Sequence, residues 1–192
     1  MIKIFYDLET TGTDPRKHSI HQIAGIIEVD GVIAEKFDLK TRPHPKAIYE
    51  PAAMRICGVT EAQLRRYPKM GLVHKVFIKM LEKYISKFDK KDKAHRVGFN
   101  NNSFDDVFLG KWFLQNGDEF MMSWFYPDSL DVMTLASQYL LDRRAAMPSF
   151  KLKRVAQELG IYASPDELHD AGYDAHLTRE IYRIVTGLEI EM

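Results

Sequence analysis

The chain has 192 residues, of which 45% are hydrophobic and 11% aromatic, and this composition excludes the highly charged, weakly hydrophobic class of disordered proteins. Ordinary domains span roughly 100–200 residues, so we predict a single domain over residues 1–192. Lysine plus arginine number 27, as do aspartate plus glutamate. A net charge of zero excludes a uniformly basic protein, so any contact with a polyanion must depend on local charge.

The cysteine count and the first residues bear on the compartment. One cysteine, Cys57, excludes an intrachain disulfide and argues against a structural zinc site built on several Cys and His ligands. The N-terminal residues show no charged leader followed by an apolar stretch, and no run of about 18 apolar residues occurs. These features predict a cytoplasmic protein without a membrane partner.

Strands dominate the first quarter of the chain. Apolar runs predict three of them, over residues 2–8, 20–29 and 32–40. Asp30-Gly31 between the second and third is a strong signal for a two-residue hairpin. The three strands should therefore form an antiparallel meander.

The pattern then becomes mainly helical. Residues 41–71 contain several prolines, which suits an irregular connection with a short helix after Pro51. Spacings of three and four predict a helix over 72–88, and an apolar run predicts a strand over 96–100. Further helices are predicted over 104–115, 130–141, 150–159 with Ser149 as its cap, and 171–186. This order predicts an α/β domain in which helices cover a mixed sheet.

Two carboxylates stand at the end of the first predicted strand. Because side chains alternate along a strand, Asp7 and Glu9 project from one face with Cα atoms roughly 6.6 Å apart. A hard divalent cation such as Mg²⁺, which takes carboxylate and phosphate oxygens, is the usual reason to hold like charges this close. An isolated pair of this kind is more often a solvated strand end, so further ligands are required.

Three more residues occur at starts of helices. Asp105 precedes apolar residues by three, four and seven positions, so it leads the core-facing side of its helix, whereas Asp106 lies toward the flank. Acidic residues are also favoured at helix starts by the helix dipole alone. Asp174 leads the apolar stripe of the last helix, and His169 lies just before that helix. His169 taken alone is better explained by a surface or capping role.

Together these residues carry a resemblance. The segments DLETTG (residues 7–12), GFNNNSFD (98–105) and HDAGYD (169–174) resemble the three motifs of the DEDDh 3′–5′ exonucleases, a DnaQ-like family. Residues 55–60 and 150–161 are similar as well, so the resemblance covers nearly the whole chain. It implies a ribonuclease H-like, three-layer α/β fold with a mixed five-stranded sheet and flanking helices.

The resemblance also implies a reaction. Phosphodiester bonds would be hydrolysed from the 3′ end of nucleic acid to release nucleoside 5′-monophosphates, with DNA or single-stranded ends favoured. Two Mg²⁺ or Mn²⁺ ions would be held by Asp7, Glu9, Asp105 and Asp174, and His169 would be the general base; all five are the expected catalytic residues.

Substrate contacts are expected near these motifs. A basic cluster that precedes the third motif is the preferred phosphate-binding surface, whereas the basic stretch over residues 69–96 is better explained as the solvated face of a helix. The expected substrate-binding residues are Thr10, Thr11, Gly12, Phe104, Lys151 and Arg154. The sequence departs from the family at Thr13, Gln22 and Cys57, where an apolar residue, glutamate, and asparagine or histidine are common.

Three other functions remain open. The first is an exoribonuclease of the same family. The second is a phosphatase in which Asp7 of an Asp7-x-Glu9-x-Thr11 pattern is the covalent nucleophile, which leaves the other two carboxylates and His169 without roles. The third is a nucleic-acid-binding module without catalysis. The partner expected from the sequence is a 3′ end of DNA or RNA, with no polymerase or repair partner and no oligomeric state specified.

Overall fold

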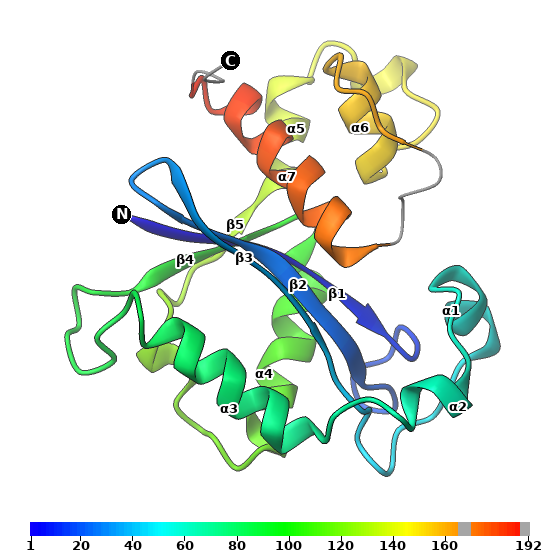
Figure 1. Cartoon of the computed structure of the whole chain (residues 1–192). Coiled ribbons are helices and arrows are strands. Elements are labelled where there is room, and N and C mark those ends of the chain that lie inside the picture. The colour runs from blue at the N-terminus through cyan, green and yellow to red at the C-terminus, as the bar shows by residue number, and fades with distance from the viewer. Residues whose placement is uncertain (165–169, 189–192) are drawn as a thin grey trace.

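The computed structural model of the chain describes residues 1–164 and 170–188. Its centre is a sheet with the strand order β3-β2-β1-β4-β5 (Figure 1). The strands are β1 (Ile2–Thr10), β2 (Ile20–Val29), β3 (Val32–Lys40), β4 (Ala94–Gly98) and β5 (Leu130–Asp131). The first three form an antiparallel meander, and β1, β4 and β5 run parallel to one another. The predicted mixed five-stranded sheet is confirmed.

The hairpin between β2 and β3 has the predicted two-residue turn. Asp30 and Gly31 separate the strands and have φ values of 49° and 89°. Positive φ at both central residues is what a type I′ turn requires, and Asp-Gly tolerates it. This turn matches the right-handed twist of the two strands that it joins.

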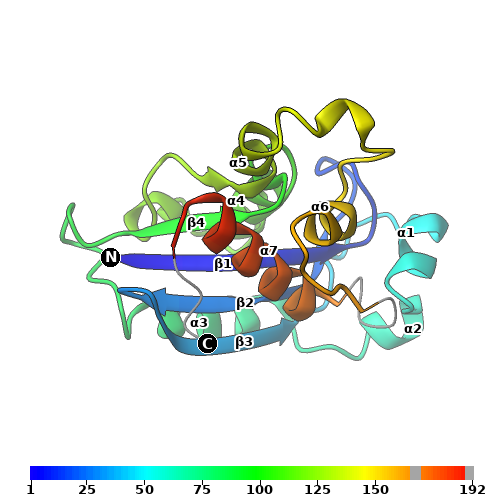
Figure 2. The ribbon, with the colours of Figure 1, turned by 90° about the horizontal axis from the view of Figure 1, so that it is seen from above.

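Helices cover both faces of the sheet (Figures 1 and 2). The helices α3 (Met70–Leu81) and α4 (Asp105–Gln115) lie on one face, and α5 (Val132–Tyr139), α6 (Leu152–Glu158) and α7 (Ala171–Val185) lie on the other. The short helices α1 (Pro51–Ile56) and α2 (Glu61–Leu64) lie beyond the carboxyl end of β1. Single 3₁₀ turns occur at Asn101–Ser103, Met121–Ser123 and Arg144–Ala146. None of the helices within the described residues has the length and apolarity needed to cross a membrane.

The central strand β1 is buried on both faces because a helical layer packs against each. Ile4 contributes to the apolar cluster that contains Phe77 and Trp112, on the side of α3 and α4. Phe5 points to the opposite side and packs edge to face with Tyr182 of α7, with ring centroids 5.4 Å apart. Residues 4–6 at the centre of β1 are apolar at consecutive positions, which is typical of a strand segment buried on both faces.

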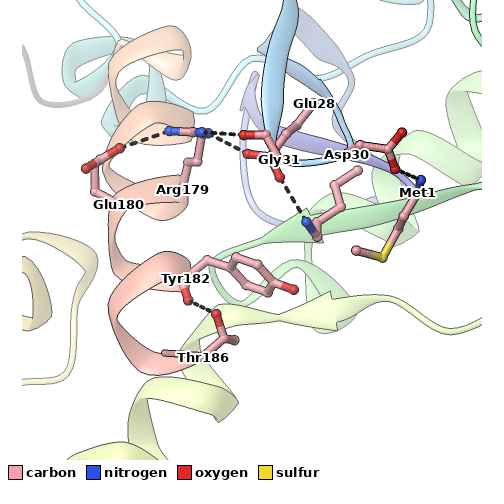
Figure 3. Close-up of polar contacts among 9 residues, drawn as sticks. Met1, Glu28, Asp30, Gly31, Arg179, Glu180, Tyr182 and Thr186 are labelled. Carbon is pink, nitrogen blue, oxygen red and sulfur yellow. Dashed lines mark hydrogen bonds and ion pairs between the residues drawn. The ribbon is translucent and has the colours of Figure 1, made fainter. Parts of the chain in front are cut away.

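A buried ion network joins α7 to the sheet. Lys3 of β1 and Glu28 of β2 face each other in the strand register, are each 2% exposed, and approach to 2.9 Å. Arg179 of α7 reaches the other Glu28 oxygen at 2.8 Å (Figure 3). Each buried charge is therefore paired, as burial of ions demands. The network fixes where α7 crosses β1 and β2.

Several predicted boundaries are wrong. The helix expected over 72–88 ends at Leu81, because the chain turns there and the Asp92 carboxylate accepts a hydrogen bond from the Ser86 amide at 2.7 Å. The helix expected from residue 130 begins at Val132, since the two preceding residues pair with β4 and the Asp131 carboxylate caps the helix. Ser149 does not cap α6, whose N-cap is Lys151.

Candidate active site

The carboxylates of β1 lie where the parallel part of the sheet ends. β1 pairs with β4 only as far as Phe5, opposite Val97, while it pairs with β2 along its whole length. Asp7 and Glu9 therefore extend past the last paired residue of β4. Asp7 is half-buried and Glu9 is buried. Crevices at the carboxyl ends of parallel strands are the usual ligand sites of α/β sheets.

Asp105 joins this pair from the other side of the chain. It is the first residue of α4 and is 4% exposed. Its Oδ1 accepts a hydrogen bond of 3.2 Å from the backbone amide of Leu8, the residue between Asp7 and Glu9. The prediction that Asp105 faces inward is therefore correct.

The neighbouring carboxylate has a different role. Asp106 accepts hydrogen bonds from the Tyr6 hydroxyl and from Arg96 Nε, the latter at 2.9 Å. Arg96 is 3% exposed, so Asp106 balances a buried positive charge. Asp106 thus stabilises the packing of α4 on β1 and β4, whereas Asp105 joins the candidate site.

The fourth carboxylate comes from the first turn of α7. The Asp170 carboxylate caps this helix and accepts hydrogen bonds from the amides of Gly172 and Tyr173 at 3.0 and 3.1 Å. Asp174 follows one turn later and is half-buried. Because α7 packs against β1, Asp174 is brought to the side of the sheet that carries Asp7 and Glu9. Its negative charge raises the pKa of both carboxyl groups. His169 lies outside the described residues, so its role stays a prediction.

Burial and mutual repulsion keep protons on this cluster. Burial, with the charges of Asp105, Glu9 and Asp174, raises the pKa of Asp7 well above its ordinary value. Burial likewise raises the pKa of Glu9 to about 7 and that of Asp105 to about 8. These three carboxyl groups, with Asp174 beside them, are costly to ionise together unless positive charge is added. An all-oxygen donor set fits hard divalent cations such as Mg²⁺ or Mn²⁺.

The turn after β1 uses the side chains of its own threonines. The Thr10 hydroxyl donates to the Gly12 carbonyl at 2.8 Å, and the Thr11 hydroxyl donates to the Ile48 carbonyl at 2.7 Å. A Cβ at Gly12 would lie 2.6 Å from the His18 ring, so the turn has no room for a side chain there. Thr11 is fully buried, and its backbone amide donates to the Ser19 carbonyl at 2.9 Å, so substrate contacts from these three residues stay a prediction.

Of the other expected substrate-binding residues, Phe104 is the N-cap of α4, Lys151 is the N-cap of α6, and Arg154 lies within α6. Phe104 is half-buried and packs against Phe108, with ring centroids 4.9 Å apart. Lys151 is exposed, and Arg154 is paired with Glu158 at 3.0 Å. Figure 2 shows α6 beside α7, the helix that carries Asp174. Nothing in these contacts tests the predicted binding roles.

The structure also brings two unexpected side chains to the site. Cys57, the C-cap residue of α1, donates a hydrogen bond from Sγ to Glu9 Oε2 at 2.8 Å, and His21 of β2 lies beside both. Cys57 stood out in the sequence only as a departure from the family, and His21 carried no signal. Gln22, another departure, donates a hydrogen bond to Asp38 of β3 at 2.9 Å.

Comparisons with known proteins agree with this geometry. A family model described as Exonuclease (RNase_T) matches residues 4–182. The PolC-type DNA polymerases III of Mycoplasmopsis pulmonis and Thermotoga petrophila are each 26% identical over 179 residues, which cover 93% of this chain and 11% of those proteins. The crystal structure of E. coli exonuclease I with a dT13 oligonucleotide matches with a TM-score of 0.77 and 23% identity, over 96% of this chain and 41% of that one. This likeness confirms the predicted exonuclease fold.

Proposed function

This chain belongs to the RNase_T exonuclease family, the DnaQ-like 3′–5′ exonucleases, and we propose that it removes nucleoside 5′-monophosphates from the 3′ end of single-stranded DNA. The family is metal-dependent, and Mg²⁺ or Mn²⁺, two ions per site, is our choice of cofactor. One observation carries the proposal: Asp7, Glu9, Asp105 and Asp174, each buried or half-buried, gather at the carboxyl end of β1, and burial raises the pKa of the first three.

Each of the four carboxylates has a proposed role in binding the two ions. Asp7 would contact both ions, Glu9 and Asp174 the first, and Asp105 the second. When bound, the two cations supply electrostatic stabilisation of the attacking and leaving oxygens. β1 orients Asp7 and Glu9, and the Leu8 amide orients Asp105, so these ligands are held in place before any ion binds.

His169 completes the proposed catalytic set. It precedes Asp170, the cap of α7, by one residue in the sequence. A histidine with an ordinary pKa near 6.5 accepts a proton at neutral pH, so His169 would take one from the attacking water. Asp174, in the first turn of α7, would bind the first cation.

The choice of DNA rests on the relatives. The matched curated proteins are named as DNA polymerases, and the matched exonuclease I structure holds a dT13 oligonucleotide. This chain spans only 11% and 41% of those chains, so substrate and partners are proposed here for this domain alone. Phe104, Lys151 and Arg154 would contact bases and phosphates.

Hydrolysis of end-labelled substrates tests the proposal. Matched 5′-labelled single-stranded DNA and RNA are incubated with Mg²⁺ or Mn²⁺, beside EDTA and the Asp7→Ala and His169→Ala variants. We expect a DNA ladder that shortens from the 3′ end and is lost with EDTA and in both variants. A ladder on RNA alone would indicate an exoribonuclease. A covalent phosphoaspartate would indicate a phosphatase. Substrate that is bound but stays intact with every metal would indicate a binding module.

A further inference from the structure

Three side chains of different chemistry meet at the edge of the carboxylate cluster. Glu9 of β1, His21 of β2 and Cys57 after α1 each offer one ligand atom, and these atoms all lie within 4.8 Å of one another. In a tetrahedral zinc site the ligand atoms are about 3.5 Å apart, given metal–ligand distances of about 2.0–2.3 Å. Small side-chain rotations would therefore close the three around one ion.

The fold creates this meeting through a register shift. Glu9 pairs with Gln22 and Thr10 pairs with Ile20, so His21 is an extra residue in a bulge of β2. Bulges re-aim side chains, and here the imidazole lies next to Glu9. The segment before α1 is held against the turn after β1 by a 2.7 Å hydrogen bond from the Glu50 amide to the Thr11 carbonyl. This contact positions α1, and with it Cys57, next to Glu9.

His21 points independently to a ligand. It is 1% exposed, and neither ring nitrogen has a hydrogen-bond partner within the described part of the chain. Buried polar atoms are almost always hydrogen-bonded, because leaving one unpaired costs free energy. An imidazole nitrogen beside a carboxylate and a thiol gains a partner when a cation binds among them.

We propose that Glu9, His21 and Cys57 form a binding site for a zinc-class cation, distinct from the all-carboxylate site and sharing Glu9 with it. Oxygen, nitrogen and sulfur ligands select Zn²⁺ or Co²⁺ over Mg²⁺, which takes oxygen ligands. Binding releases the Cys57 thiol proton to solvent and replaces the hydrogen bond from Cys57 to Glu9. Cys57 is half-buried, which leaves a route for the ion.

The site has a regulatory consequence that rests on the proposed function. Glu9 is one of the proposed ligands of the catalytic cations. When Glu9 binds a zinc ion together with His21 and Cys57, it is not available to the catalytic cations. Zinc would therefore inhibit Mg²⁺-supported hydrolysis. The binding itself does not depend on the chain being a nuclease.

Cobalt spectroscopy tests the binding, because Cys57 is the only cysteine and a thiolate-to-cobalt charge-transfer band can arise only from it. Co²⁺ is titrated into metal-free protein in the presence of excess Mg²⁺. We expect a band that saturates at one ion per chain and is bleached by Zn²⁺. The band should be absent in the Cys57→Ser variant, which keeps a hydroxyl donor near Glu9. In the His21→Asn variant, the affinity of the protein for Co²⁺ should fall at least tenfold.

Controls separate this proposal from the proposed function. Circular dichroism first shows that each variant is folded. Asp105→Asn leaves all three ligands in place, so it should keep the cobalt band while losing hydrolysis. No band in folded wild-type protein, or an unchanged Co²⁺ affinity in folded His21→Asn, would overturn the zinc site. A normal band in a wild-type protein that hydrolyses nothing would overturn only the proposed function.

Inhibition gives the second readout. Zn²⁺ is added to wild type and to Cys57→Ser, and each is compared with its own Mg²⁺-supported rate. We expect the half-inhibiting Zn²⁺ concentration to be at least tenfold higher in the variant. Equal concentrations would show that zinc acts at the carboxylates and not through Cys57.

Discussion

The backbone amide of Leu8 donates a hydrogen bond of 3.2 Å to Asp105 Oδ1, although the two residues are 97 positions apart. Leu8 lies between Asp7 and Glu9, so one short segment of β1 supplies two carboxylates and orients a third. The bond needs only an acceptor oxygen on residue 105. An asparagine there can keep the bond while it removes the charge.

Asp105→Asn should stabilise the metal-free protein while it abolishes activity. Burial raises the pKa of Asp105 to about 8, against an ordinary value of 3.8. Between these two pH values, Asp105 is protonated in the folded state and ionised in the unfolded state. Stability contributed by this group therefore falls as the pH rises through that window, and the variant escapes the loss. In EDTA at pH 8.5 we expect Tm to rise by roughly 3 °C or more, as about 1 kcal/mol gives in a domain of this size. Hydrolysis with Mg²⁺ should fall at least roughly 100-fold. An unchanged Tm would contradict the repulsion argument.

Asp106→Ala is the matched control, because it removes the adjacent carboxylate. Arg96 then keeps a buried charge without its partner, which typically costs about 3 kcal/mol. We expect a lower free energy of unfolding in urea, with activity of the folded protein reduced far less than in Asp105→Asn. A stable but inactive Asp106→Ala would show that the two carboxylates have been assigned the wrong way round.

The Mg²⁺ requirement should depend strongly on pH. Glu9, with a pKa of about 7, and Asp105, with a pKa of about 8, must lose their protons before they can bind a cation. Lowering the pH through these values makes Mg²⁺ compete with protons. We expect half-saturation at pH 6.5 to need at least roughly tenfold more Mg²⁺ than at pH 8.5, measured by isothermal titration calorimetry. The same Mg²⁺ affinity at both pH values would show that the carboxylates are ionised throughout.

Glu28→Gln should reduce stability without reducing the turnover of folded protein. Burial favours protonation of Glu28, but hydrogen bonds and charges from Lys3 and Arg179 outweigh it and hold the pKa of Glu28 below its ordinary value of 4.5 (Figure 3). The stabilisation is therefore present above pH 4.5 and is lost as the pH falls through the lower, folded-state value. We expect a loss of about 3 kcal/mol at pH 7 by urea unfolding, which shrinks in acid.

Glu35→Gln supplies the control for that measurement. Glu35 pairs with Lys83 at 2.9 Å, but the lysine is 56% exposed. Exposed pairs contribute about 0–1 kcal/mol, so the free energy of unfolding should change little. Equal losses in the two variants would argue against a special contribution from the buried network.

Gly98→Ala should disturb the loop that leads to Asp105. A Cβ at Gly98 would lie 2.6 Å from Asn101 Cβ and 3.3 Å from the Tyr6 carbonyl. Relief of this overlap typically costs about 1–3 kcal/mol and would shift the turn before α4. We expect a lower Tm together with a weaker Mg²⁺ affinity.

Gly110→Ala provides the comparison within α4. The nearest atom to its added Cβ is Met121 Sδ at 3.9 Å, which is ordinary contact. Alanine favours a helix over glycine, so this variant should be more stable by roughly 0.5–1 kcal/mol, measured by thermal melts. Loss of stability in both variants would indicate that the Gly98 effect does not come from the close approach to Asn101.

The sequence alone determined the features that depend on neighbouring residues. Asp30-Gly31 predicted the hairpin because a type I′ turn needs positive φ at both positions. Helical spacing separated Asp105, which faces the site, from Asp106, which pairs with Arg96. The three motifs predicted the family, and through it the five-stranded sheet that local patterns showed only in part.

Only the tertiary structure decided which distant residues touch. β5 has two residues and exists because Leu130 and Asp131 pair with β4, so no local pattern marks it. Arg179 meets Glu28 across 151 positions. His21 reaches Glu9 and Cys57 because of a one-residue bulge, and a shift of one residue changes the face to which a strand side chain points. Residue types reveal which chemistry is available, but register and helix packing set the distances at which it can act.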